Sequence, residues 1–203
     1  FGGYGHILRD ARFMSFVASF TLTQICAALI WVLLSVYTKV NFGLPERLYG
    51  WLPTTNAIMV VLFQLWVTQR TKWRPPLRMM AVGSLLYALG VGSIALGRGF
   101  SGFWLSMVVL TVGELILVPT ATTYAANLAP ADMRGRYMSI YGLTWGLASG
   151  IGPIFGGLLN DHLGPAFIWY GGFVVGLIAM VSFMVLAPRF PANLPTEVEA
   201  AGD

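Results

Sequence analysis

One carboxylate in this sequence falls where a charge is costly. Glu114 lies near the middle of the apolar stretch from Phe103 to Ala126, whereas the other seven of the eight acidic residues lie in predicted loops or near the ends. A charge at the centre of a membrane helix costs about 2.5 to 3.5 kcal/mol on insertion scales, so such a group commonly faces a cavity and marks an ion or substrate path. Alternatively, burial keeps the carboxyl neutral, and it donates one structural hydrogen bond to a neighbouring helix. Both interpretations stay open, because no second charged group lies deep within the predicted spans.

Other polar and aromatic residues in the apolar stretches could line a wet cavity. Gln24 and Trp31 share one helical stripe of the first span, Asn56 lies in the second, and Trp145 lies deep in the fifth. Such a stripe suits either a cavity wall or a contact between helices. Pro119 lacks a backbone N–H, so we expect a bend one turn beyond Glu114 and a carbonyl left without its helical donor.

Glycines dominate the fifth apolar stretch. They predict close approach of helix backbones, and a helix rich in glycine and proline could also bend or slide during a conformational change. The first row repeats every four residues and consists of Gly142, Gly146 and Gly150. A second row consists of Gly152 and Gly156, with Pro153 between them.

A serine and a histidine offer a different chemistry. Gly99 to Gly102 spell GxSG just before the fourth span, and His162 precedes the sixth. Rhomboid intramembrane serine proteases look superficially similar, so a nucleophilic pair of Ser101 and His162 is a remote alternative. Both residues fall in predicted loops, where a Gly/Ser turn and a surface histidine are ordinary.

The elements that position these residues are membrane helices. Hydrophobic residues make up 57% of the 203 positions and charged residues 10%, which leaves too little polar surface to coat a water-soluble globule. Crossing the hydrocarbon core takes about 20 mostly apolar residues in a helix. We therefore predict an all-α polytopic membrane protein with six transmembrane helices, at Phe13 to Tyr37, Trp51 to Val67, Leu77 to Leu96, Phe103 to Ala126, Tyr137 to Asn160 and Ala166 to Leu186.

Basic residues are distributed unevenly between the two sides of this arrangement. Nine of the twelve lie on the side of the termini, including Arg134 and Arg136 in the fourth loop, and three lie opposite. By the positive-inside rule, both termini are predicted to be cytoplasmic. We divide the chain into a cytoplasmic lead-in at 1–12, a six-helix bundle at 13–187 and a disordered cytoplasmic tail at 188–203. The lone Cys26 is expected to be inert, and the start at Phe1 is interpreted as a truncation.

From Leu8 to Leu186 the chain resembles the C-terminal half of the major facilitator superfamily, in its drug-exporter-like bacterial branch. The resemblance rests on an ordered set of segments, with LRDARF before the first span and YGWLPTTNAIMVVLFQ in the second. The later segments match in the order and spacing of helices ten and eleven: GELILVP (Gly113 to Pro119), LAPADMRGRYMSIYGLTWG (Leu128 to Gly146) and GIGPIFGGLL (Gly150 to Leu159). The basic loop QRTKWRPPLR (Gln69 to Arg78) departs from the family's gate motif because it lacks the glycine and the aspartate.

The resemblance implies half of a twelve-helix secondary transporter that works by alternating access, with an N-terminal six-helix bundle missing from this chain. It implies a bacterial inner membrane protein that is not an enzyme and exports amphipathic molecules, driven by a proton gradient and without a metal or cofactor. Its expected partners are a small-molecule substrate and membrane lipid, not nucleic acid. A facilitator-like sensor or assembly subunit is the alternative. The cavity or coupling residues would be Gln24, Trp31, Asn56, Glu114 and Trp145, with Glu114 carrying the proton.

Overall fold

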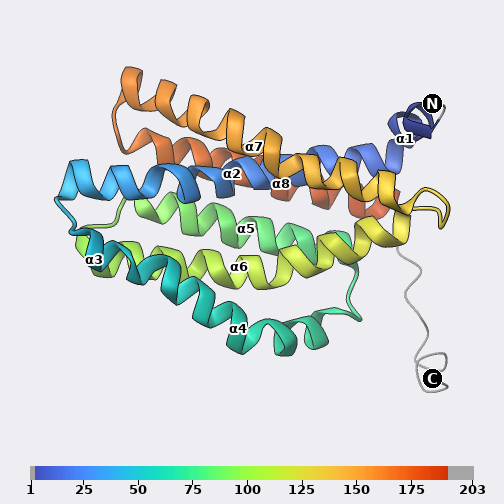
Figure 1. Ribbon diagram of the computed structural model, residues 1–203, viewed down its shortest axis with the longest axis horizontal. Helices are drawn as coiled ribbons and strands as arrows, with labels where there is room; N and C mark the ends of the chain where they lie inside the picture. The colour runs from blue at the N-terminus through green and yellow to red at the C-terminus, as the bar shows by residue number, and fades with distance from the viewer. Residues whose placement is uncertain (1–2, 192–203) are drawn as a thin grey trace.

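A computed structural model describes residues 3–191, and helices account for all the regular structure in that range (Figure 1). Six of the helices are long and apolar enough to cross a membrane, which confirms the predicted all-α, six-helix fold class. The helices are α1 (Gly3–Arg9), α2 (Ala11–Phe42), α3 (Glu46–Tyr49), α4 (Trp51–Thr71), α5 (Pro76–Ile94), α6 (Gly99–Leu128), α7 (Arg134–Leu163) and α8 (Phe167–Arg189).

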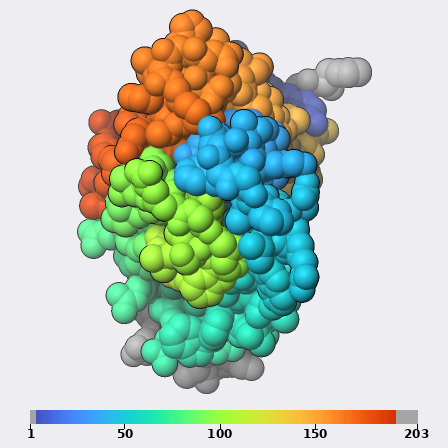
Figure 2. All heavy atoms as spheres, turned by 90° about the vertical axis from the view of Figure 1, so that its left-hand side faces the viewer, coloured from blue at the N-terminus to red at the C-terminus, as the bar shows by residue number. Residues whose placement is uncertain are grey.

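The six long helices run up and down side by side, so the bundle has two distinct ends. The end where α2 begins and α8 ends is called the terminal end here. It also carries the α4–α5 and α6–α7 connections (Figure 1). The far end carries α3 and the α5–α6 and α7–α8 connections. Figure 2 looks onto the far end and shows α7 and α4 at opposite edges of the bundle, with α2 and the start of α6 between them.

The centre of the bundle is formed by α2 and α5. Helix α5 packs mainly against α6 and α8, α2 packs against α7 and α8, and α4 packs chiefly against α6. Aromatic rings fill the terminal half of the core, where the centroid of Phe13 lies 4.5 Å from that of Tyr137 and the ring of Phe20 stacks on Tyr141. Such pairs add directional contacts to the packing of apolar surface between α2 and α7.

The outer faces of the bundle are apolar, as lipid-facing or partner-facing surfaces must be. Helix α4 buries Leu52 and Asn56, while Ile58, Val61 and Leu65 are exposed. Helix α7 likewise leaves several leucines and isoleucines exposed. A water-soluble bundle would place charged residues on these faces, so lipid or another membrane helix must cover them.

Each predicted span coincides with one observed helix, although the ends differ. Helix α2 begins at Ala11 because Asp10 caps it, accepting a hydrogen bond of 3.0 Å from the backbone N–H of Phe13. Helix α8 continues through Pro188 to Arg189, since a proline in the last turn removes a single helical hydrogen bond. The predicted lead-in contains α1, and most of the predicted tail, 192–203, lies outside the described residues, as do residues 1–2.

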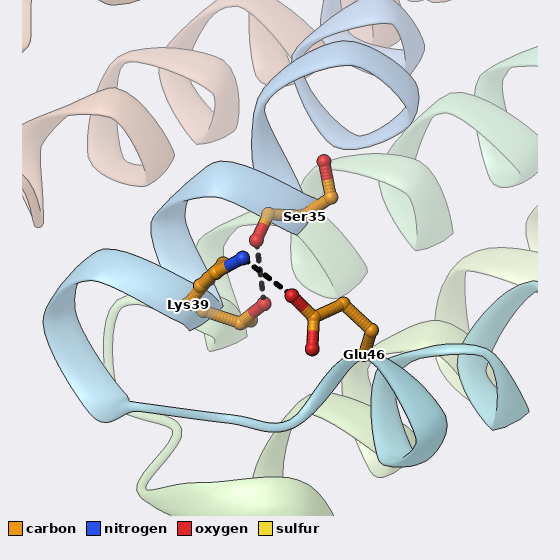
Figure 3. Close-up of polar contacts among 4 residues, drawn as sticks. Ser35, Lys39 and Glu46 are labelled. Atoms are coloured by element: carbon orange, nitrogen blue, oxygen red, sulfur yellow. Dashed lines mark hydrogen bonds and ion pairs between the residues drawn. The ribbon is translucent and has the colours of Figure 1, made fainter.

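A tight turn leads from α2 to α3 at the far end. Gly43 ends α2 with a left-handed φ of 60°, and its N–H donates to the carbonyl of Lys39. Figure 3 shows the side chains of Lys39 in α2 and Glu46 in α3 pointing toward each other, joined as an ion pair, beside Ser35, whose carbonyl accepts a hydrogen bond of 3.1 Å from Thr38. Both charged side chains are exposed, so the pair adds little stability and serves mainly to orient the turn.

Candidate functional site

Glu114 is joined to a neighbouring helix by a buried amide. Its Oε2 accepts a hydrogen bond of 2.6 Å from Nδ2 of Asn56 in α4, and the same nitrogen lies 3.0 Å from Oγ1 of Thr111. An amide nitrogen carries two hydrogens, so Asn56 can make both bonds at once. Thr111 and Glu114 are three residues apart on α6 and therefore share one face. Two predicted site residues, Asn56 and Glu114, are thus brought together inside the membrane-spanning region.

The carboxyl of Glu114 is satisfied on one side only. Among the described residues, its second oxygen, Oε1, has no hydrogen-bond partner. Oε1 is also not one of the buried unpaired atoms, so it is at least partly accessible. Glu114 itself is half-buried. Oε2 can accept from Asn56 whether the carboxyl is charged or neutral, while Oε1 remains reachable from outside the bundle. The arrangement can therefore take up or release a proton at Oε1 without losing the contact between α4 and α6.

Pro119 leaves an acceptor on α6 that α4 fills. Without an N–H at Pro119, the carbonyl of Leu115 lacks its helical donor, and Nε2 of Gln64 donates to that carbonyl at 3.1 Å. The same Gln64 nitrogen also donates to Oγ1 of Thr68 at 3.1 Å. The orphan acceptor that the sequence predicts is therefore satisfied by a side chain of the neighbouring helix.

Glycines hold α6 close to α5 and so fix the position of Glu114. A Cβ added at Gly113 would lie 2.8 Å from the carbonyl oxygen of Gly83, and one added at Gly90 would lie 2.7 Å from Cβ of Leu110. Backbone approach this close requires residues without side chains. Four-residue glycine spacing does not predict this contact, because Gly83 and Gly90 on α5 are seven residues apart. Gly113, next to Glu114, was the available signal.

Three predicted cavity residues lie apart from the Glu114 network. Gln24 and Trp31 are half-buried on α2, where Trp31 packs against the core, and Trp145 on α7 is 42% exposed. Within the described residues, no hydrogen bond joins any of them to Asn56 or Glu114. They define separate places on the bundle, and Trp145 belongs to a face that this chain leaves uncovered.

The two glycine rows of α7 have different surroundings. Gly152 and Gly156 face α2, where an added Cβ would lie 3.1 Å from Cβ of Ala28 and 2.5 Å from Cδ1 of Leu33, respectively. Pro153 lies half-buried between them. The other row has nothing within 4 Å of an added Cβ among the described residues, so it has no packing partner in this bundle: Gly142, Gly146 and Gly150.

At the terminal end, a polar contact that the sequence does not predict joins α2 to α7. Oδ2 of Asp10 accepts a hydrogen bond of 3.0 Å from the hydroxyl of Tyr137, while Oδ1 caps α2. Arg134 and Arg136, in the first turn of α7, are both exposed. A second missed contact is buried, where the hydroxyls of Thr23 in α2 and Ser84 in α5 lie 2.8 Å apart. Both bonds join residues on different helices, so they can be identified only once the helix packing is known, and the sequence does not predict either of them.

The proposed serine and histidine pair is not assembled. Ser101 lies in the first turn of α6 and His162 in the last turn of α7, not in loops, and both are exposed. The Nδ1 atom of His162 lies 3.0 Å from the carbonyl oxygen of Leu158 in its own helix. Among the described residues there is also no group of three or more histidine, cysteine, aspartate or glutamate side chains that could hold a metal ion.

This six-helix membrane bundle, with a carboxyl held between two helices, matches one protein family over most of its length. Residues 14–202 match the model of the Major Facilitator Superfamily, and the chain belongs to that family. Membership identifies a transporter-type protein, not an enzyme, and removes the rhomboid-like alternative. The fold agrees, because a crystal structure of a POT family transporter in complex with a thioalcohol-conjugated peptide aligns with a TM-score of 0.70 at 23% identity, covering 91% of this chain and 44% of that one.

Several named relatives are similar to this chain. The uncharacterised MFS-type transporter YttB of Bacillus subtilis (strain 168) is 31% identical over 170 residues, which cover 81% of this chain and 42% of YttB. The multidrug resistance protein MdtH of Cronobacter sakazakii (strain ATCC BAA-894) is 27% identical over 195 residues, covering 93% of this chain and 47% of MdtH. The rubrofusarin-specific efflux pump aurT of Gibberella zeae is 28% identical over 155 residues, covering 75% and 24%. The chain spans less than half the length of these relatives.

Proposed function

We propose that this chain is half of a secondary active transporter that exports small amphipathic molecules in exchange for protons, with Glu114 as the proton carrier. The observation that supports this most is the half-satisfied carboxyl inside the membrane region, bonded to Asn56 through Oε2 and open at Oε1. A carboxyl in this position is costly for a purely structural helix and is typical of a proton or substrate path.

A proton at Glu114 would change how α4 is held. The Asn56 donor stabilises a carboxylate more than a neutral acid, so a helix movement that lengthens this bond favours protonation, and its return favours release. Helix α4 buries only Leu52 and Asn56 among its residues, and hydrogen bonds from Asn56 and Gln64 form part of its attachment to α6, so we expect it to move more easily than the inner helices. We infer that proton exchange at Oε1 and the docking of α4 onto α6 are linked in this way during alternating access.

The uncovered faces of α4 and α7 fit a second bundle. Both helices bury few residues, and α7 presents Trp145 together with the unpartnered glycines Gly142 and Gly146. Since the relatives are about twice as long as this chain, we infer that their other half packs against these faces and closes a cavity around the Glu114 site. The row of glycines would then let backbones approach across that interface.

The substrate class and the orientation are also proposals. An apolar and aromatic surface with one carboxyl suits amphipathic molecules, and the names of MdtH and aurT agree with export of such compounds. Most basic residues lie at the terminal end, so we place that end on the cytoplasmic side of the cell membrane of a bacterium.

The test is proton-driven transport by the full-length protein in proteoliposomes, with a panel of lipophilic cations and neutral drugs beside sugars. We expect drug movement that depends on the proton gradient and is lost in Glu114→Gln, while Glu46→Gln, which removes an exposed carboxyl at the far end, keeps it. Movement of sugars alone would overturn the substrate class. Flux in Glu114→Gln equal to that of the parent would overturn the carrier role, and no flux at all would favour the sensor or assembly alternative.

A further inference from the structure

A pocket with basic residues opens at the terminal end, where α4 and α6 diverge (Figure 1). It has a volume of about 470 Å³, and Pro119 of α6 is among the residues that line it. Arg12 of α2 and Pro191, just after α8, also line it. Small-molecule sites in proteins typically occupy about 300 to 1,000 Å³, so the pocket is large enough for a ligand group.

Among residues 3–191, the charged side chains that line this pocket are all basic. They are Arg12, Lys72 and Arg74. Across residues 3–191 the ion pair that the structure contains joins Lys39 and Glu46 at the opposite end of the bundle. The nearest acid in the sequence to Arg12 is Asp10, and its carboxylate is occupied by the N–H of Phe13 and the hydroxyl of Tyr137. Within the part of the chain that the structure describes, three cations therefore line a cavity to which no carboxylate contributes.

Arg12 is held in place before any ligand arrives. Its Nε donates to the hydroxyl of Tyr124 at 3.3 Å, and its guanidinium carbon lies 5.8 Å and 5.7 Å from the ring centroids of Tyr124 and Phe190. Aromatic contacts and one hydrogen bond fix the side chain but use only Nε. The two terminal nitrogens remain available as the paired donors that bind phosphate oxygens.

Neutral donors complete the lining. Oγ1 of Thr68 accepts from Gln64, so its own hydrogen is available, and Thr123 and Asn127 contribute a further hydroxyl and amide. Pro76, Pro119 and Leu128 give the pocket an apolar margin. Cations, hydroxyls and an apolar margin together suit an anion attached to a nonpolar body, as at the surface of a bilayer.

We propose that this pocket binds a phosphate ester, with the phosphate between Arg12 and the Lys72–Arg74 segment. The source is the head group of an acidic phospholipid or a soluble phosphate ester, and the two share the same recognition chemistry. The site is distinct from the Glu114 carboxyl and its two partners, because neither Asn56, Thr111 nor Glu114 lines it.

Binding to the purified full-length protein in detergent tests this assignment. Phosphatidylglycerol is titrated and the bound lipid counted by native mass spectrometry, with phosphatidylcholine as the uncharged comparison and glycerol 3-phosphate as the soluble probe. The variant Lys72→Gln/Arg74→Gln removes two lining cations. Its matched control, Arg70→Gln/Arg78→Gln, removes two exposed cations that flank the same connection, in the last turn of α4 and the first turn of α5, and do not line the pocket.

We expect phosphatidylglycerol to bind more tightly than phosphatidylcholine, and the lining variant to lose roughly 30-fold in affinity while the control loses only a few-fold. Displacement of the lipid by millimolar glycerol 3-phosphate would assign the site to a soluble ester, and its failure would assign it to the lipid. Equal losses in the two double variants, or no preference for phosphatidylglycerol, would overturn the site. A weaker loss for Arg12→Lys than for Arg12→Gln would add that the charge itself is recognised.

Discussion

The side-chain amide of Gln64 in α4 donates a 3.1 Å hydrogen bond to the backbone carbonyl of Leu115 in α6, the carbonyl that Pro119 deprives of its helical donor. A defect in one helix thereby becomes an attachment point for the next. Asn56 donates to the carboxyl of Glu114 itself, so two amides of α4 bond to the adjacent residues Glu114 and Leu115 of α6. Movement of α4 cannot leave the surroundings of Glu114 unchanged.

Replacement of Gln64 by leucine should destabilise the full-length protein by about 0.6 to 1.7 kcal/mol, the range measured for interhelical hydrogen bonds in membranes. Unfolding in detergent measures the change, and Gln69→Leu, an exposed residue of the same helix, is the control. In a Pro119→Ala background, an N–H at residue 119 can bond to Leu115, so the same Gln64→Leu change should cost less. An undiminished cost in that background would contradict the assigned bond.

Comparing Asn56→Leu with Glu114→Gln should separate the contribution of Glu114 to stability from its proposed role in proton exchange. Glutamine keeps an acceptor for Asn56, so Glu114→Gln should change the free energy of unfolding by less than about 1 kcal/mol. Leucine at position 56 leaves both Thr111 and Glu114 without their donor, and should cost about 1 to 3 kcal/mol. Unfolding of both variants under the same conditions measures this difference. Strong destabilisation by Glu114→Gln would mean that the neutral side chain fails structurally, and its transport defect could not then be attributed to proton exchange.

Gly113→Ala should force α5 and α6 apart, because the new methyl group would lie 2.8 Å from the carbonyl oxygen of Gly83. Overpacking of this kind costs about 1 to 3 kcal/mol. Gly146→Ala is the comparison, since nothing described lies within 4 Å of its added Cβ. In the full-length protein, we expect thermal unfolding to show a clear loss for Gly113→Ala. A comparable loss for Gly146→Ala would support the proposed packing of a second bundle against this row.

The orientation of the bundle can be tested with introduced cysteines. Cys26 is fully buried, so the parent should give little maleimide labelling at this site and serves as the blank. Arg98→Cys, exposed at the far end, should react with a membrane-impermeant maleimide in intact cells, whereas Arg9→Cys at the terminal end should react only after the membrane is broken. The reverse pattern would place the terminal end outside.

The sequence predicts the helices well because a membrane span must satisfy its own backbone and be apolar for about 20 residues. Glu114 also stands out, since its position carries an energetic cost that no neighbour in the sequence offsets. Its partner could not be identified in the same way. Asn56 and Thr111 meet Glu114 only because α4 packs on α6, and this pairing depends on surfaces that hydropathy does not distinguish.

The glycines show what the sequence does not predict about helix packing. A four-residue repeat predicts close packing, yet Gly142 and Gly146 have no partner among the described residues, whereas Gly83 and Gly113, which belong to no such repeat, let α5 and α6 approach closely. Small residues permit a close approach without specifying the partner. Only the packed structure identifies which surface uses them.

The attachment of α4 has a consequence for how this bundle assembles and persists in a bilayer. Helix α4 buries only Leu52 and Asn56, fewer residues than any other spanning helix, and hydrogen bonds from Asn56 and Gln64 to α6 form part of its attachment. Such bonds weaken wherever water can compete for the same donors and acceptors. We therefore expect α4 to dock last during insertion and to detach first when the membrane interior becomes wet, so that hydration of the hydrocarbon region, more than its thickness, limits the lifetime of the folded bundle.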